Sequence, residues 1–228
     1  NELVLNESVF KGTAVSSLNF GNRLITFKKA ALNKLATLTS VIFGENAIIK
    51  QAEDEAFTGT SLTTVQIPAV ENVSKFGNGV FGGISTLESF TLAENNTVHE
   101  VVDGVLYLKD GENLILIQVP AGKFDAQDTF VLPDNVVTIK TYAFEGVTVD
   151  TVYTSADSIL ATLEKDCFGY YVATLSCKVK TLVLPATVSK FDAKAVENCT
   201  QLSAINYRGT GIQWGKVVAD NNLSLPDS

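Results

Sequence analysis

LPDNVVTIKTYAFEGV, residues 132–147, is the stretch that decides the fold, because its parts recur along the chain. Within it, Pro133 and Asp134 stand before an apolar run, and the pair Ala143-Phe144 stands at the end of that run. With Phe144 as the anchor, similar surroundings occur at Phe10, Leu32, Phe57, Phe81, Phe168 and Val196. Most neighbouring anchors lie roughly two dozen residues apart, a period typical of solenoids that stack one coil per repeat.

The positions around the anchor also share properties. The residue directly before it is small or β-branched: Val9, Ala31, Ala56, Val80, Ala143, Cys167 and Ala195. An apolar or small residue stands five places before it: Leu5, Phe27, Ala52, Phe76, Ile139, Leu163 and Phe191. Two places after it we expect mostly turn residues with positive φ: Gly12, Lys34, Gly59, Gly83, Gly146, Tyr170 and Asn198. Each repeat is therefore predicted to turn around its anchor.

A short strand pattern recurs once per coil, apolar at alternate positions. It is present at Leu18/Phe20, Val41/Phe43, Val65/Ile67, Phe90/Leu92, Phe130/Leu132, Val152/Thr154, Leu182/Leu184 and Ile205/Tyr207. Because side chains alternate between the two faces of a strand, one face of each rung points into the core. The sequence predicts a leucine-rich repeat solenoid: a right-handed coil with a parallel sheet of about eight rungs and short helical or irregular convex segments.

One interval, from Phe81 to Phe144, is much longer than the repeat. Within it, residues 105–108 and 114–119 are rich in β-forming side chains and flank the turn signal Lys-Asp-Gly-Glu-Asn. The rung at Phe130/Leu132 shows that the coil continues beyond this interval. We therefore predict a β-hairpin inserted at about residues 98–122 and projecting from the solenoid.

Three motifs together resemble BspA-like leucine-rich repeat proteins, a bacterial cell-surface family. They are V-x-x-I-x-x-x-A-F-x-G at residues 136–146, VDGVLYLKDGENLILIQVPAG at 102–122 and INYRGTGIQWGKV at 205–217. The likeness covers essentially residues 1–217. It implies a cell-surface or secreted protein used in adhesion or protein recognition, although related repeats also occur in some protozoa.

The predicted domain is a single solenoid over residues 1–217, with a tail at 218–228. An open solenoid exposes core and unpaired strand groups at its ends, so we expect a C-terminal cap at about residues 205–217 with Trp214 as its lid. The alternative for Trp214 is sugar binding. The first coil, with Leu3 and Leu5, looks uncovered, which suggests a piece cut from a longer repeat array.

Composition excludes several classes of function. With 25 acidic and 17 basic residues the formal charge is −8, which repels nucleic acid and anionic lipid. The longest strongly apolar runs, such as residues 114–119, are far shorter than the roughly 20 residues of a membrane-spanning helix. We expect no nucleic-acid partner and no membrane insertion in this segment, and an extracellular or cell-surface location follows from the resemblance.

The outward positions of the rungs form the predicted interaction surface. We name as candidate partner-binding residues Ser17, Asn19, Ser40, Thr64, Gln66, Ser89, Thr91, Thr129, Thr151, Tyr153, Thr181 and Asn206. This set is rich in Ser and Thr and carries no charge, which suits a broad, weakly polar contact. Threonine also favours exposed strand positions without any partner, and the two interpretations stand equal.

The hairpin supplies a second candidate, because segments that interrupt a regular scaffold often carry recognition. Tyr107 with Leu108, or Leu116 with Gln118, would face the partner. The favoured alternative is that the hairpin only shields the core where half a coil is missing. A glycan partner would use Tyr107, Tyr153 or Trp214 as a stacking platform.

Catalysis, cofactors and metals find little support. His99 is the single histidine, with no nucleophile elbow beside it, so we expect a solvated loop residue. The run Glu53-Asp54-Glu55 lacks calcium-loop spacing and is expected to be a solvated face. Of the three cysteines, Cys167 and Cys199 occupy packing positions, so free buried thiols are favoured over a disulfide that would join two of Cys167, Cys177 and Cys199.

The sequence thus favours a non-enzymatic surface or secreted protein that binds a host or neighbouring-cell protein through its strand face. The alternatives are a carbohydrate-binding module and a structural spacer within a longer surface protein. No cofactor or metal is expected.

Overall fold

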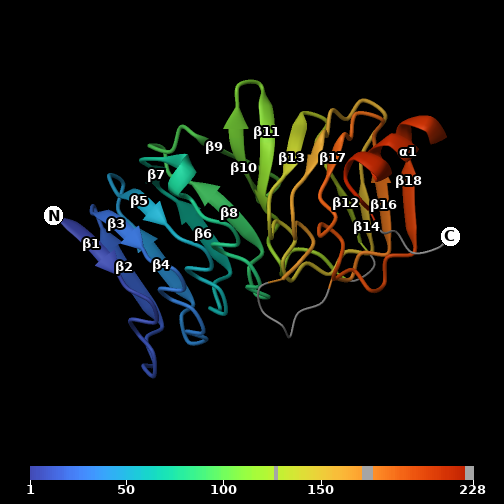
Figure 1. The fold of residues 1–228 in the computed structure, drawn as a ribbon. Helices are drawn as coiled ribbons and strands as arrows, with labels where there is room; N and C mark the ends of the chain where they lie inside the picture. Colours follow the sequence, from blue (N-terminus) through green and yellow to red (C-terminus); the bar gives the residue numbers. More distant parts are fainter. Residues whose placement is uncertain (126–127, 171–176, 224–228) are drawn as a thin grey trace.

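The computed structural model describes residues 1–125, 128–170 and 177–223. Its coils stack in chain order along one direction, so β1 and α1 lie at opposite ends of the molecule (Figure 1). Each regular coil contributes one strand to each of two faces, and the apolar side chains between these faces make the core. The predicted leucine-rich repeat solenoid is confirmed.

The eight predicted rungs make up one face, which we call the strand face. Its strands are β2 (Ser17–Gly21), β4 (Ser40–Phe43), β6 (Thr64–Ile67), β8 (Ser89–Leu92), β12 (Thr129–Val131), β14 (Thr151–Tyr153), β16 (Thr181–Leu184) and β18 (Ala204–Tyr207). They pair in parallel as β2-β4, β6-β8 and β12-β14-β16-β18. The rungs are therefore present, but their hydrogen-bonded ladder is divided into three sheets.

The opposite face also consists mainly of strands, where short helical or irregular segments were expected. One sheet holds β1 (Glu2–Leu5), β3 (Leu24–Phe27), β5 (Ile48–Ala52) and β7 (Ala69–Val70). A second holds, among others, β13 (Val136–Ile139), β15 (Thr162–Leu163) and β17 (Lys190–Phe191). Among the described residues the one short helical segment on this side is η1 (Val73–Lys75).

The anchors hold successive coils together through the backbone. The N–H of Phe57 donates to the carbonyl of Val80 at 2.9 Å, and the N–H of Phe144 donates to that of Cys167 at 3.0 Å. Each acceptor is the residue directly before the next anchor. This position lies between two coils, which explains why it holds small or β-branched side chains. The positive φ predicted two places after the anchor is found at Gly12, Lys34, Gly59, Gly83 and Gly146.

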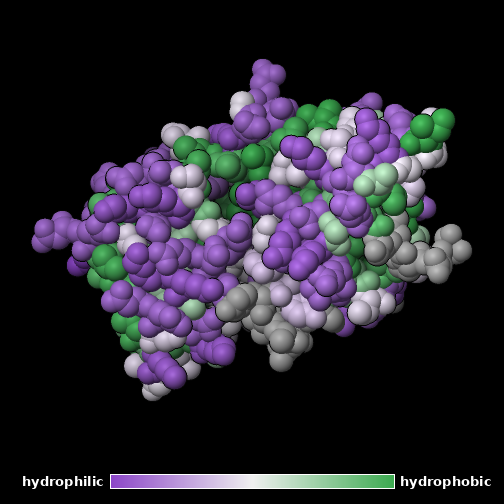
Figure 2. All heavy atoms as spheres, viewed as in Figure 1, coloured by the Kyte–Doolittle hydropathy of each residue, from purple (hydrophilic) through white to green (hydrophobic). Residues whose placement is uncertain are grey.

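The predicted hairpin is confirmed, and its strands also pair with neighbouring strands on both sides. Strands β10 (Val105–Asp110) and β11 (Asn113–Gln118) are antiparallel, and β9 (His99–Val102) pairs with the other edge of β10. Strand β11 continues in parallel onto β13, with Leu116 beside Ile139. The tip rises above the coils (Figure 1), hydrophilic on the face drawn in Figure 2, while hydrophobic atoms show at its base.

The hairpin also stands between two hydrophobic clusters. The N-terminal cluster contains Phe27, Phe57 and Leu106, and the C-terminal cluster contains Tyr107 and Phe144. Because Leu106 and Tyr107 are neighbours on β10, their side chains leave opposite faces of the strand. Strand β10 therefore separates the two clusters and packs against both of them.

The C-terminal end closes with a helix that the sequence pattern did not predict. Helix α1 (Gly211–Asp220) starts with a capping box between Thr210 and Gln213. The Trp214 ring lies 5.1 Å from that of Tyr207 and 6.5 Å from that of Phe191. Trp214 therefore packs on the last coil, at the place where the lid was expected. Across the described residues, no helix combines the length and apolar character needed to cross a bilayer.

The side chain of Asn221 covers the edge of β17. Its Oδ1 accepts from the N–H of Phe191 at 3.2 Å, and its Nδ2 donates to the carbonyl of Ser189 at 3.1 Å. An amide side chain in this position makes the donor and acceptor contacts that a neighbouring strand would make. The last strand of this face is therefore protected from pairing with another chain.

Candidate functional site

The strand face brings the predicted partner-binding residues together in two rows. Parallel pairing sets Thr129, Thr151 and Thr181 side by side in one row, and Val131, Tyr153 and Val183 in the next. The N-terminal rungs repeat this arrangement, with Ser17 beside Ser40 and Thr64 beside Ser89. The exposed members are Ser17, Asn19, Thr64, Gln66, Thr91, Thr129 and Asn206; the half-buried ones are Ser40, Ser89, Thr151, Tyr153 and Thr181.

On β12, β14 and β16 the second row holds two valines and a tyrosine, and on β18 it ends at the polar Asn206. Val131 is 60% exposed, and Tyr153 and Val183 are half-buried beside it. In β6 and β8 the same row holds Gln66 and Thr91, which are polar. We call Val131, Tyr153 and Val183 the apolar strip.

Arg208 fixes the aromatic ring at the centre of this strip. Its guanidinium carbon lies 5.3 Å from the centroid of the Tyr153 ring. One guanidinium nitrogen donates to the Tyr153 hydroxyl at 2.9 Å and to the carbonyl of Thr154 at 3.2 Å. Arg208 was not among the predicted partner-binding residues; its position directly after β18 is the sequence feature that places it near this face.

The structure corrects the prediction that Tyr107 faces a partner. Tyr107 is 1% exposed, because β10 lies between β9 and β11 and its ring enters the C-terminal cluster. Leu116 and Gln118 are also buried, and Gln118 donates to the carbonyl of Ala143 at 3.2 Å. Leu108 is half-buried. Of the residues proposed on the hairpin, only Leu108 is left with part of its side chain in solvent.

His99 is likewise corrected from a solvated loop residue to a buried strand residue. It is 1% exposed in β9, its N–H donates to Asn96 Oδ1 at 3.0 Å, and its ring centroid lies 5.4 Å from that of Phe76. Burial, with a smaller contribution from the Lys109 ammonium, lowers the pKa of His99 to about 4. The ring is neutral at pH 7 and packs as part of the fold.

This burial predicts a pH-dependent stability. An unfolded histidine titrates near pH 6.5, so its neutral form stabilises the fold above that pH, and the contribution falls as the pH drops toward the folded pKa of about 4. We expect the His99 contribution to the free energy of unfolding to fall by about 2 kcal/mol between pH 7 and pH 5.

Urea unfolding of the wild type and of His99→Gln at both pH values measures this contribution, since carboxylates titrate equally in the two proteins. An equal loss of stability in wild type and variant would show that His99 is not the titrating group.

The cysteines differ from the favoured prediction. Cys177 and Cys199 form a disulfide with their Cα atoms 4.7 Å apart, so Cys199 is not a free packing residue. Cys167 is free and fully buried, as predicted, and burial raises the pKa of its thiol. Cys177 and Cys199 both belong to the C-terminal cluster. Residues 171–176, in the loop after Tyr170, lie outside the described residues.

The acidic run is a structural bridge between coils, where a solvated face was expected. Glu53 accepts from Lys28 Nζ at 2.9 Å and from the N–H of Lys29 at 2.8 Å, and these bonds lower its pKa. Asp54 accepts from the N–H of Asn78 at 2.8 Å, and Glu55 is buried. Across residues 1–125, 128–170 and 177–223, no group of three or more His, Cys, Asp or Glu side chains is arranged to hold a metal ion.

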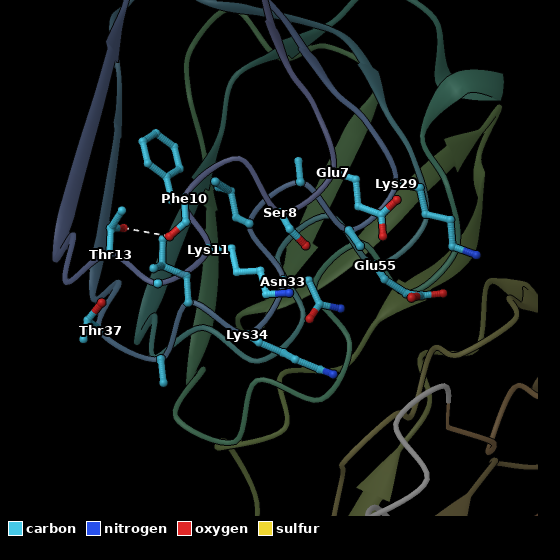
Figure 3. A pocket seen from close by; sticks show the side chains of 16 residues that line it. Glu7, Ser8, Phe10, Lys11, Thr13, Lys29, Asn33, Lys34, Thr37 and Glu55 are labelled. Atoms are coloured by element: carbon cyan, nitrogen blue, oxygen red, sulfur yellow. Dashed lines mark hydrogen bonds between the residues drawn. The ribbon is translucent and has the colours of Figure 1, made fainter.

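A cavity that the sequence analysis missed lies among the turns of the first coils (Figure 3). Its volume is about 680 Å³, and we call it the N-terminal cavity. Residues 7, 8, 10–13 and 29–37, together with Glu55, line it. Figure 3 shows Lys11, Asn33 and Lys34 on one side, and Glu7, Lys29 and Glu55 on the other.

Known proteins can now be compared with this geometry. The sequence matches the BspA type leucine rich repeat region in six copies, over residues 4–109 and 123–218. Among curated proteins the comparison finds no match.

Three solved structures share the fold. A leucine rich cell surface protein from Faecalibacterium prausnitzii is 21% identical with a TM-score of 0.54, and the match covers 89% of this chain and 62% of that one. The pneumococcal vaccine antigen PcpA is 18% identical with a TM-score of 0.63, over 85% and 51%. A leucine-rich repeat protein from Eubacterium ventriosum is 17% identical with a TM-score of 0.52, over 85% and 60%. The match spans about half to three fifths of these chains.

Proposed function

This chain belongs to the BspA type leucine rich repeat family, and from that premise we propose a non-enzymatic, cell-surface or secreted protein that binds another protein through its strand face. The partner would be a host or neighbouring-cell surface protein. The disulfide between Cys177 and Cys199 supports an exported location, because such bonds persist mainly in oxidising compartments.

The observation that carries the proposal is the apolar strip with its fixed tyrosine. Protein-binding surfaces concentrate their binding energy in a few residues, and Tyr and Arg are enriched among these. The contacts of Arg208 with Tyr153 immobilise the ring before any partner arrives, which reduces the entropy lost on binding. The Ser and Thr rows around the strip add area without the large cost of desolvating a charge.

The protein-binding interpretation is favoured over a sugar-stacking platform. Of the three rings considered for stacking, Tyr107 is buried and Trp214 packs on Tyr207 and Phe191. Tyr153 remains, but Arg208 already lies against its ring. Each of the three rings is therefore already engaged within the protein, which disfavours them as a platform on which sugars stack.

Charge introduced on the strand face tests the proposal. The triple variant Thr64→Glu, Thr91→Glu and Thr151→Glu should lose at least about 90% of the partner captured, because a bound partner would bury three carboxylates without counter-ions. The measurement is a pull-down from extracellular matrix and epithelial surface proteins, quantified by mass spectrometry against the wild type.

A matched control places the same charges elsewhere. Thr97→Glu, Thr162→Glu and Thr200→Glu add three carboxylates off the strand face and should leave capture unchanged; circular dichroism checks that both triple variants fold. Equal capture by the strand-face variant and the wild type would remove the strand face as the binding surface.

A further inference from the structure

The first coils carry a charge opposite to that of the whole chain. The protein has a formal charge of −8, yet no Asp or Glu occurs between Glu7 and Glu45. The same interval contains Lys11, Arg23, Lys28, Lys29 and Lys34. Winding the chain into coils brings three of these lysines, Lys11, Lys29 and Lys34, to the N-terminal cavity.

Two of these lysines are available to a ligand. Lys28, which does not line the cavity, pairs with Glu53 at 2.9 Å on the neighbouring coil. Lys11 and Lys34 are exposed, and no carboxylate among the described residues forms an ion pair with either. They lie on the same side of the cavity (Figure 3). This side therefore presents two exposed ammonium groups that pair with no carboxylate of the described chain.

The backbone holds both lysines at defined places. The N–H of Lys11 donates to the carbonyl of Ser8 at 2.9 Å. Lys34 has φ +60°, a backbone conformation that residues other than glycine seldom adopt. Its N–H donates to the carbonyl of Thr58 at 2.9 Å. Their Cα positions are therefore set by the turn and by the stacking of the coils.

The remainder of the cavity suits a ligand rich in hydroxyl groups. Ser8 and Asn33 line it with groups that both donate and accept hydrogen bonds. Glu7, on the opposite side, accepts hydrogen bonds from hydroxyls and repels anions (Figure 3). The cavity therefore favours a ligand with an anionic group at one end and neutral hydroxyls at the other.

We propose that the N-terminal cavity binds an acidic carbohydrate, with its sulfate or carboxylate on Lys11 and Lys34 and its hydroxyls toward Ser8, Asn33 and Glu7. The volume of about 680 Å³ lies within the range of small-molecule sites. The overall charge of −8 repels long polyanions, so binding is confined to short ligands at this place. The site is separate from the strand face, and either one can fail without the other.

Calorimetry with a heparin-derived tetrasaccharide tests the site. The wild type should bind it, and the variant Lys11→Gln, Lys34→Gln should bind at least about tenfold more weakly. Lys190→Gln, Lys194→Gln makes the same change of net charge at exposed lysines on a distant coil and should bind like the wild type. Glu7→Gln should bind about two- to fivefold more tightly, because it removes repulsion of the anion.

Two further probes test the chemical class. Cellotetraose, which lacks the anion, and hexaglutamate, which lacks the sugar hydroxyls, should each bind at least about tenfold more weakly than the tetrasaccharide. The proposal is overturned by no binding to the wild type, by equal losses in the two lysine variants, or by hexaglutamate binding as tightly as the tetrasaccharide.

Discussion

Phe57→Ala should lower the free energy of unfolding by about 3–5 kcal/mol, because it empties the centre of the N-terminal cluster. Phe57 is fully buried, and its ring centroid lies 4.8 Å from that of Phe27 on the coil before and 4.8 Å from that of Phe81 on the coil after. Coils on both sides hold these neighbours in place, so they cannot collapse into the space left. Urea unfolding followed by circular dichroism measures the loss.

Phe10→Ala is the matched control, since Phe10 is the anchor of the first coil. Phe10 is half-buried, with a described coil on one side only. Its removal should cost about 1 kcal/mol, because less apolar area is returned to water and no closed cavity forms. If Phe10→Ala destabilised the protein as much as Phe57→Ala, stacking between neighbouring coils would not be the source of the core energy.

The repeat predicted the strand face well because two independent signals agree there. Apolar residues alternate along each rung, and the anchors recur at a regular interval, so a one-residue error in register would turn every rung inside out. The opposite face lacked the first signal. Its strands are as short as Thr162–Leu163, too short to show alternation. The sequence does carry one sign of these strands: the apolar or small residue five places before the anchor is the last residue of β1, β3, β5, β13, β15 and β17.

The errors at the candidate site have a common cause in the hairpin. A two-stranded hairpin projecting into solvent would leave one face of β10 exposed, and Tyr107 was placed there. Pairing of β9 with β10 and of β11 with β13 instead puts the inserted strands inside a six-stranded sheet. The β9–β10 pairing is a local hairpin around Asp103 and Gly104, whereas the β11–β13 pairing is non-local and joins residues more than twenty positions apart. Tyr107 and His99 are both buried in the sheet that results. The contact between Arg208 and Tyr153 is of the same non-local kind.

Removal of the disulfide should produce the second large loss of stability. Cys177→Ser, Cys199→Ser should lower the free energy of unfolding by about 3 kcal/mol, because the bond closes a loop with a sequence separation of 22 and restricts the unfolded chain. The loss should be confined to the C-terminal cluster, to which both cysteines belong. Urea unfolding with and without dithiothreitol measures it: the wild type should lose about 3 kcal/mol on reduction, and the double variant nothing.

Cys167→Ala separates the bond from the packing of cysteine side chains. Alanine occupies the same slot before the anchors at Ala31, Ala56 and Ala143, so this variant should lose less than about 1 kcal/mol and keep the full response to dithiothreitol. A wild type that reduction leaves unchanged would mean that Cys177 and Cys199 are not joined in the protein. An exported location would then be supported by the family alone, because the disulfide is the feature of the described residues that indicates an oxidising compartment.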